Sequence, residues 1–176
     1  MGPPTLLGER RVAGSLLVTG FAILVVAAVL YGDGAYPAGH AWQSNALTVG
    51  LVLTLLGLTA LQVVLSDSGD RLLARLGTIA YLVGVVLWIV DDAIDLAGGR
   101  FIYELERDYV LLASLAIAAF GGAILKTRIL PPWVGGIAVV LAVVYPVLYL
   151  DRILQAPLGP NLITGLFGLG LLVHRP

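Results

Sequence analysis

Long uncharged stretches alternate along the chain with short clusters of charged residues. Six such stretches occur, each rich in Leu, Val, Ala and Ile. A helix needs roughly 20 residues to cross about 30 Å of hydrocarbon, and four stretches reach that length. The third and fourth hold 15 and 17 uncharged residues, and Arg75 can extend the third by reaching back to the interface. The pattern predicts six transmembrane helices, at about residues 12–31, 46–65, 73–95, 104–125, 132–150 and 156–173.

The segments between these stretches agree with that division. Ser66–Asp70 reads Ser-Asp-Ser-Gly-Asp, a composition typical of a tight polar turn. Pro131 and Pro132 precede Trp133, which suits the first turn of a helix at a membrane interface. The first stretch is about twice as long as the apolar part of a signal peptide, which favours a retained helix over a cleaved one. We therefore expect an all-α polytopic transmembrane bundle in which residues 1–176 form a single domain.

The distribution of basic residues orients the predicted bundle. With six crossings, one side carries seven basic residues and the other carries three, so the positive-inside rule places both termini in the cytoplasm. Acidic residues sort in the opposite way, with three inside and eight outside. The outer set comprises Asp33, Asp91, Asp92, Asp95, Glu104, Glu106, Asp108 and Asp151, against Arg100, Arg107 and Arg152.

Composition narrows the function further. The chain is 59% hydrophobic and 12% charged, whereas soluble domains are about a quarter charged. Its net charge of -1 disfavours nucleic acid as a partner. There is no cysteine, and His40 and His174 fall on opposite sides of the predicted membrane, so they cannot share a haem or a metal ion. We expect no cofactor and no catalytic residue, while the sequence leaves a metal site undetermined.

The segment Val86–Asp95 places three aspartates directly after an apolar run. Asp91 follows Arg75 by sixteen residues, or about 24 Å of helix, so Asp91 and Asp92 reach the outer boundary when Arg75 lies at the inner one. A charge at mid-bilayer costs roughly 2.5–3.5 kcal/mol, which also favours the boundary. Trp88 marks the same level. Asp95 lies four residues after Asp91 and three after Asp92, so all three aspartates can lie near one face of a helix.

Other outer helix ends add to this acidic segment. Glu104, Arg107 and Asp108 share three-four spacing, as do Tyr145, Tyr149 and Arg152. Carboxylates this close repel one another unless a cation or an arginine intervenes. One interpretation is an outward-facing vestibule that binds or helps to move a small cation or cationic ligand. The other is an arginine-paired polar rim behind an ordinary aromatic belt. The candidate binding residues are Asp91, Asp92, Asp95, Glu104, Asp108, Asp151, Tyr149 and Trp88.

Small residues indicate close helix packing. Ser114, Ala118 and Gly122 repeat every four residues, and Gly165 and Gly168 lie within the last stretch. An alternative function follows, that of an assembly or regulatory subunit packed against a membrane-protein partner or a second copy. A lipid-active enzyme that uses the outer carboxylates is a third reading. No phosphate loop, zinc motif or nucleophile elbow is present, which favours a non-enzymatic protein.

The segment Arg128–Gly136 resembles a group of uncharacterised bacterial polytopic membrane proteins that share a domain of unknown function. In that group a basic-apolar-Pro-x-Trp segment leads into a late helix in the same way. The resemblance implies a multi-pass protein of a prokaryotic inner membrane, in contact with the lipid bilayer. It implies no catalytic residue.

Overall fold

The computed structural model describes residues 4–31, 41–98, 102–151, 153 and 158–173, and these residues form helices and no strand. The all-α fold is therefore confirmed. A short 3-10 helix, η1 (Gly159–Asn161), leads directly into the last helix. The α-helices are α1 (Pro4–Tyr31), α2 (Ala41–Asp67), α3 (Leu72–Leu96), α4 (Tyr103–Thr127), α5 (Pro132–Leu150) and α6 (Leu162–Val173).

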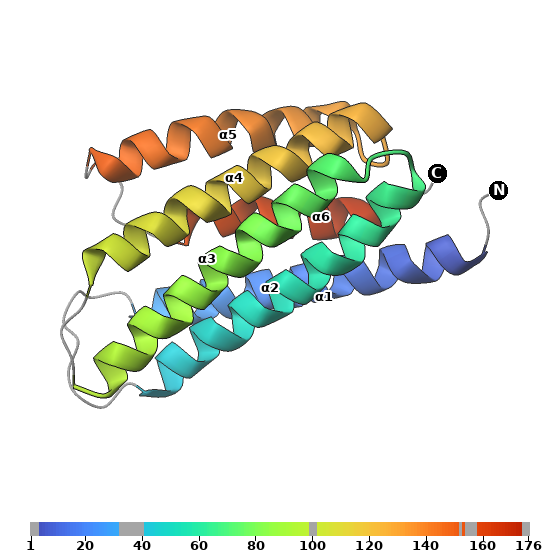
Figure 1. The fold of residues 1–176 in the computed structure, drawn as a ribbon. Coiled ribbons are helices and arrows are strands. Elements are labelled where there is room, and N and C mark those ends of the chain that lie inside the picture. Colours follow the sequence, from blue (N-terminus) through green and yellow to red (C-terminus); the bar gives the residue numbers. More distant parts are fainter. Residues whose placement is uncertain (1–3, 32–40, 99–101, 152, 154–157, 174–176) are drawn as a thin grey trace.

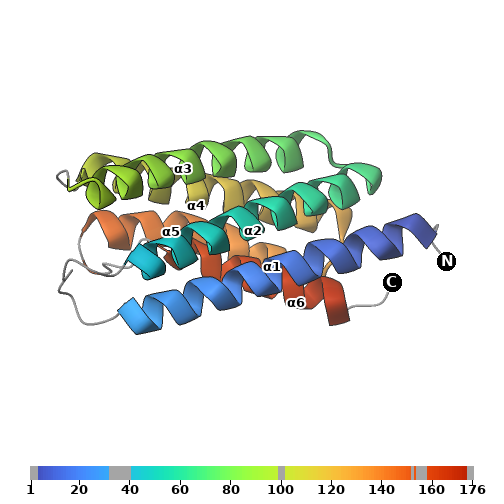
Figure 2. The same ribbon diagram turned by 90° about the horizontal axis from the view of Figure 1, so that it is seen from below.

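The helices lie side by side along one common direction and form an elongated bundle (Figure 1). Helix α1 packs between α2 and α6, and α4 packs between α3 and α5. Contacts between α2 and α3 join these two groups, whereas α5 and α6 barely touch. The start of α1 and the end of α6 lie at the same end of the bundle (Figures 1 and 2).

Glycines at the helix crossings bring the backbones close together. A Cβ atom on Gly135 of α5 would lie 2.7 Å from the carbonyl oxygen of Gly121 on α4. A Cβ on Gly168 of α6 would lie 2.9 Å from the carbonyl oxygen of Gly14 on α1. In a bilayer the lipid tails are as apolar as the helix surfaces, so close van der Waals packing of this kind drives association. Small residues therefore determine where α4 packs against α5 and where α1 packs against α6.

Large apolar side chains cover the outside of the bundle. Val29, Val140 and Leu115, on three different helices, are 73%, 59% and 59% exposed. In the part of the chain that the structure describes, five helices are long and apolar enough to cross a membrane. Exposed aliphatic surface on every long helix is expected where the surrounding solvent is hydrocarbon. The fold is that of a multi-pass membrane protein in contact with lipid.

The last helix is shorter than the sequence predicted. The predicted helix at 156–173 begins in residues that the structure does not describe, and α6 itself starts at Leu162. The apolar segment Gly159–Val173 is about 22 Å long, less than the hydrocarbon thickness of about 30 Å. Five of the six predicted spans have sufficient length, and the sixth crossing stays a prediction.

The opposite departure occurs at the first helix, which begins at Pro4 instead of about residue 12. Hydropathy marks the part of a helix that lies in lipid, and a helix can continue beyond it into the headgroup region. Glu9, Arg10 and Arg11 therefore interrupt the apolar run without ending α1. The guanidinium of Arg10 reaches the connection before α5, where its Nη2 donates to the carbonyl oxygen of Ile129 at 3.0 Å.

The end of the bundle that holds Arg10 is called the basic end here, and the end where α3 finishes and α4 begins is called the acidic end. At the basic end, Asp70 Oδ1 accepts a hydrogen bond from the backbone N–H of Leu73 at 2.9 Å, in the first turn of α3. Its other oxygen lies 3.0 Å from Lys126 Nζ, at the end of α4. This buried aspartate holds the α2–α3 turn against α4.

Candidate functional site

The three aspartates at the end of α3 face different neighbours. Asp91 is buried and turned toward α4, where its Oδ1 accepts a hydrogen bond from the backbone N–H of Ile102 at 3.1 Å. Asp92 is turned toward α2, where its Oδ2 accepts hydrogen bonds from the hydroxyls of Ser44 and Thr48. Asp95 is exposed. The spacing allowed a shared face, but the structure gives Asp91 and Asp92 separate partners.

Glu106 of α4 is the carboxylate most closely surrounded by aromatic groups. Its Oε1 accepts a hydrogen bond from the hydroxyl of Tyr149 on α5. The phenol of Tyr145, one turn deeper on α5, is close enough to Glu106 for electrostatic interaction. Tyr103 stacks on Tyr149, with ring centroids 6.3 Å apart and an interplanar angle of 12°. Glu106 is only partly exposed and lies near enough to Asp91 for the two carboxylates to repel each other.

The remaining candidates lie nearer to water. Glu104 and Asp151 are exposed. Asp108 pairs with its neighbour Arg107, with Arg107 Nη2 2.7 Å from Asp108 Oδ1. Asp33, Arg100 and Arg152, which the sequence placed at the same end, lie outside the described residues.

The carboxylates at this end are satisfied mainly by neutral donors. Among the described residues, Arg107–Asp108 is the one ion pair at the acidic end. Asp91, Asp92 and Glu106 instead accept hydrogen bonds from a backbone amide, two hydroxyls and a phenol. A neutral donor stabilises a carboxylate without cancelling its charge, so the negative potential of these three groups persists around the site.

A buried polar network lies deeper in the bundle. The Asn161 side chain, in η1, accepts a hydrogen bond from the hydroxyl of Tyr81 and donates one to the hydroxyl oxygen of Tyr109, both at 2.6 Å. Tyr81, Tyr109 and Asn161 are all buried. Trp88 packs edge-on against Tyr109, with ring centroids 5.1 Å apart, so the network touches the aromatic groups of the acidic end. The network joins α3, α4 and the start of α6.

Several residues of this region were absent from the candidates drawn from the sequence. Glu106 was counted only as an outer acid, and Tyr109 and Asn161 were not considered as site residues. Spacing offered a partial signal for Glu106, because it lies three and four residues from Tyr103 and Ile102 at the start of α4. Glu106 meets Tyr149 only because α4 and α5 are each rotated about their axes so that these side chains face each other. The apolar pattern of the sequence does not define that rotation.

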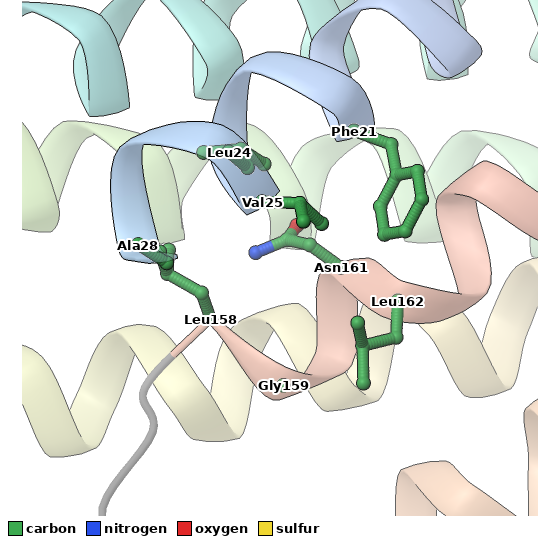
Figure 3. Close-up of a pocket in the computed structure, with 8 residues that line it drawn as sticks. All are labelled: Phe21, Leu24, Val25, Ala28, Leu158, Gly159, Asn161 and Leu162. Carbon is green, nitrogen blue, oxygen red and sulfur yellow. The ribbon is translucent and has the colours of Figure 1, made fainter. Parts of the chain in front are cut away.

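Two apolar cavities lie below the acidic end. The larger, about 150 Å³, lies between α1 and the start of α6 (Figure 3). Among the described side chains that line it, only that of Asn161 is polar, and both ends of this amide are occupied by tyrosines. The smaller, about 70 Å³, lies between α4, α5 and the start of α6. The lining of the larger cavity is Phe21, Leu24, Val25, Ala28, Leu158, Gly159, Asn161 and Leu162.

The arrangement combines a carboxylate with an aromatic ring, two kinds of group that an ammonium-type cation binds. Within the described part of the chain, no three histidine, aspartate or glutamate side chains lie close enough to share one metal ion. An organic ammonium needs fewer carboxylates and also binds aromatic faces. Glu106 supplies the carboxylate, and Tyr149, with Tyr103 stacked on it, supplies aromatic rings in its surroundings.

Comparison with known proteins adds no relative to this picture. No protein-family model, no curated protein sequence and no solved structure matches the chain.

Proposed function

We propose that this membrane protein binds a small organic cation at its acidic end, around Glu106. The observation that carries the proposal is the environment of that carboxylate, which accepts a hydrogen bond from Tyr149 and lies within electrostatic range of Tyr145. A cation placed there would meet one negative charge directly and a second, from Asp91, nearby. The tyrosine rings would add cation–π attraction, worth about 0.5–2 kcal/mol for each well-placed ring.

The cellular setting is part of the same proposal. The excess of basic residues at the opposite end supports a cytoplasmic basic end and a non-cytoplasmic acidic end. The site would then face away from the cytoplasm, in a prokaryotic inner membrane. Such a protein would bind its ligand there for uptake, export or sensing.

Titration with tetramethylammonium chloride tests the proposal. The purified protein, in an uncharged maltoside detergent, is titrated calorimetrically, with sodium chloride at equal ionic strength as the blank. We expect saturable binding, and at least a tenfold loss of affinity in Glu106→Gln, which removes the charge and keeps the shape. Asp92→Asn should lose less, because Asp92 faces α2.

The matched control is Asp67→Asn, which removes an exposed carboxylate at the basic end. It should leave the affinity for tetramethylammonium unchanged. The proposal is wrong if the unmodified protein shows no saturable binding, or if the Asp67 and Glu106 variants lose affinity equally.

A subunit role has one observation in its favour. Gly136 of α5 would place a Cβ atom in open space, on a helix whose neighbours within the bundle lie chiefly on α4. Small residues on an uncovered helix face are a common surface for partner helices. Purification in mild detergent tests this candidate, because a stoichiometric membrane partner or a stable dimer would favour it over cation binding.

A further inference from the structure

We propose that the cation recognised by this protein is amphiphilic, with its ammonium group at Glu106 and an alkyl chain in the cavity between α5 and α6. This inference rests on the proposed function and adds the ligand class. It combines three features of the molecule: a carboxylate without a cationic partner among the described residues, an apolar cavity one to two turns deeper, and a seam between two helices that opens toward lipid.

The cavity begins where the carboxylate site ends. Tyr145 lines the cavity and also lies within electrostatic range of Glu106. Tyr149, which donates to Glu106, lies four residues from Tyr145 on the same helix, while Ala142 lies three residues deeper. One helical turn rises about 5.4 Å, so the floor of the cavity lies roughly 10 Å below the carboxylate. That separation suits a ligand with a charged head and a short chain.

The inner wall of the cavity is buried and its rim is open. Ile117, Ala142 and Ile163 are 1%, 9% and 5% exposed and form the inner wall. Leu141 and Leu162, on α5 and α6, are 39% and 58% exposed and form the rim. Since these exposed residues belong to the apolar surface of the bundle, the cavity opens sideways into the hydrocarbon. An amphiphile already dissolved in the bilayer could enter between α5 and α6, which barely touch.

The close contact between α5 and η1 fixes the upper edge of this opening. A Cβ atom on Gly159 would lie 1.9 Å from the ring of Tyr145, so only glycine leaves room for the tyrosine there. The ring therefore lies between the cavity and the carboxylate. A ligand would pass along it, with its chain below the ring and its charge above.

A series of alkyltrimethylammonium salts tests the inference. Methyl, butyl and hexyl members are titrated well below their micelle concentrations into the purified protein in maltoside detergent. Each methylene buried in the cavity should raise the affinity about fourfold, until the cavity of about 70 Å³ is full. Ala142→Phe fills the cavity and should abolish this dependence on chain length, while the affinity for tetramethylammonium changes less than threefold.

A second variant enlarges the cavity instead of filling it. Ile163→Ala enlarges the cavity, so the affinity should continue to rise beyond the chain length at which the unmodified protein levels off. If affinity depends on alkyl-chain length in the same way in the unmodified protein, Ala142→Phe and Ile163→Ala, then the alkyl chain binds to the detergent and the inference is wrong. If tetramethylammonium does not bind at all, the proposed function fails instead, so the two failures can be told apart.

Discussion

At the scale of single residues, Asn161 joins three helices through buried hydrogen bonds. Its amide bridges Tyr81 of α3 and Tyr109 of α4, and its backbone carbonyl oxygen accepts a hydrogen bond from the hydroxyl of Thr164 at 2.6 Å. Asparagine is suited to this position because it offers a donor and an acceptor on one short side chain. The amide thereby positions the start of α6 against two helices that are distant in sequence.

Replacement of Asn161 by alanine should therefore destabilise the bundle. Two buried tyrosine hydroxyls would each lose a partner, at a cost of about 1–3 kcal/mol. We expect a lower midpoint of thermal unfolding in detergent for Asn161→Ala. The double variant Tyr81→Phe/Asn161→Ala should recover part of the loss, because it removes one of the two hydroxyls that lost this partner. An Asn161→Ala protein as stable as the unmodified one would show that the amide is dispensable.

At the scale of helices, the pairs are set by which small residues meet. Gly135 and Gly136 are neighbours on α5 and have opposite surroundings. The first lies against the Gly121 carbonyl of α4, while a Cβ on the second would have no atom of another described segment within 4 Å. The two positions therefore form a natural pair for testing how α5 is held.

Gly135→Ala should destabilise the protein, and Gly136→Ala should not. The added methyl at position 135 would force α4 and α5 apart, at a cost of about 1–3 kcal/mol. At position 136 the same methyl meets nothing, and alanine favours a helix interior over glycine by about 0.5–1 kcal/mol. Unfolding midpoints of both variants, measured side by side, provide the check. Equal destabilisation of the two variants would contradict this account, because it would mean that Gly136 also lies against a surface, such as that of a partner helix.

The sequence predicts the helices themselves, but it does not predict which neighbouring helix each side chain faces. Uninterrupted apolar runs predicted the six α-helices that the structure describes, five of which are long enough to cross the hydrocarbon. The pattern carries little information on rotation about each helix axis, since lipid and protein interior are both apolar. For that reason the sequence found Asp91 and Asp92 together but did not predict that one faces α4 and the other α2.

The predictions for small residues were likewise correct for some helix contacts and missed others. Gly168 was read as a packing residue, and the structure places it against Gly14 of α1. The Gly121–Gly135 contact was not predicted, since neither glycine forms part of the spaced ladder at Ser114, Ala118 and Gly122. A spacing rule identifies small residues on one helix, but contact also requires the matching position on another helix.

At the scale of the whole molecule, charge separates along the bundle axis. The acidic end holds Asp91, Asp92 and Glu106, and the basic end holds Arg10 and Lys126. The helices run alternately between these ends, with the start of α1 and the end of α6 at the same one (Figure 1). Our central claim is that this axis crosses the membrane, with the carboxylates at the non-cytoplasmic boundary and with α6 as a sixth crossing.

Cysteine labelling in intact cells tests this claim most directly, since the chain has no native cysteine. Three charge-neutral variants suffice: Ser68→Cys in the α2–α3 turn, Ala97→Cys after α3, and Pro176→Cys beyond α6. A membrane-impermeant maleimide should label Ala97→Cys from outside, and the other two only after the cells are permeabilised. External labelling of Pro176→Cys but not of Ser68→Cys would mean that α6 does not cross, and protection of Ala97→Cys would contradict the outward-facing acidic end.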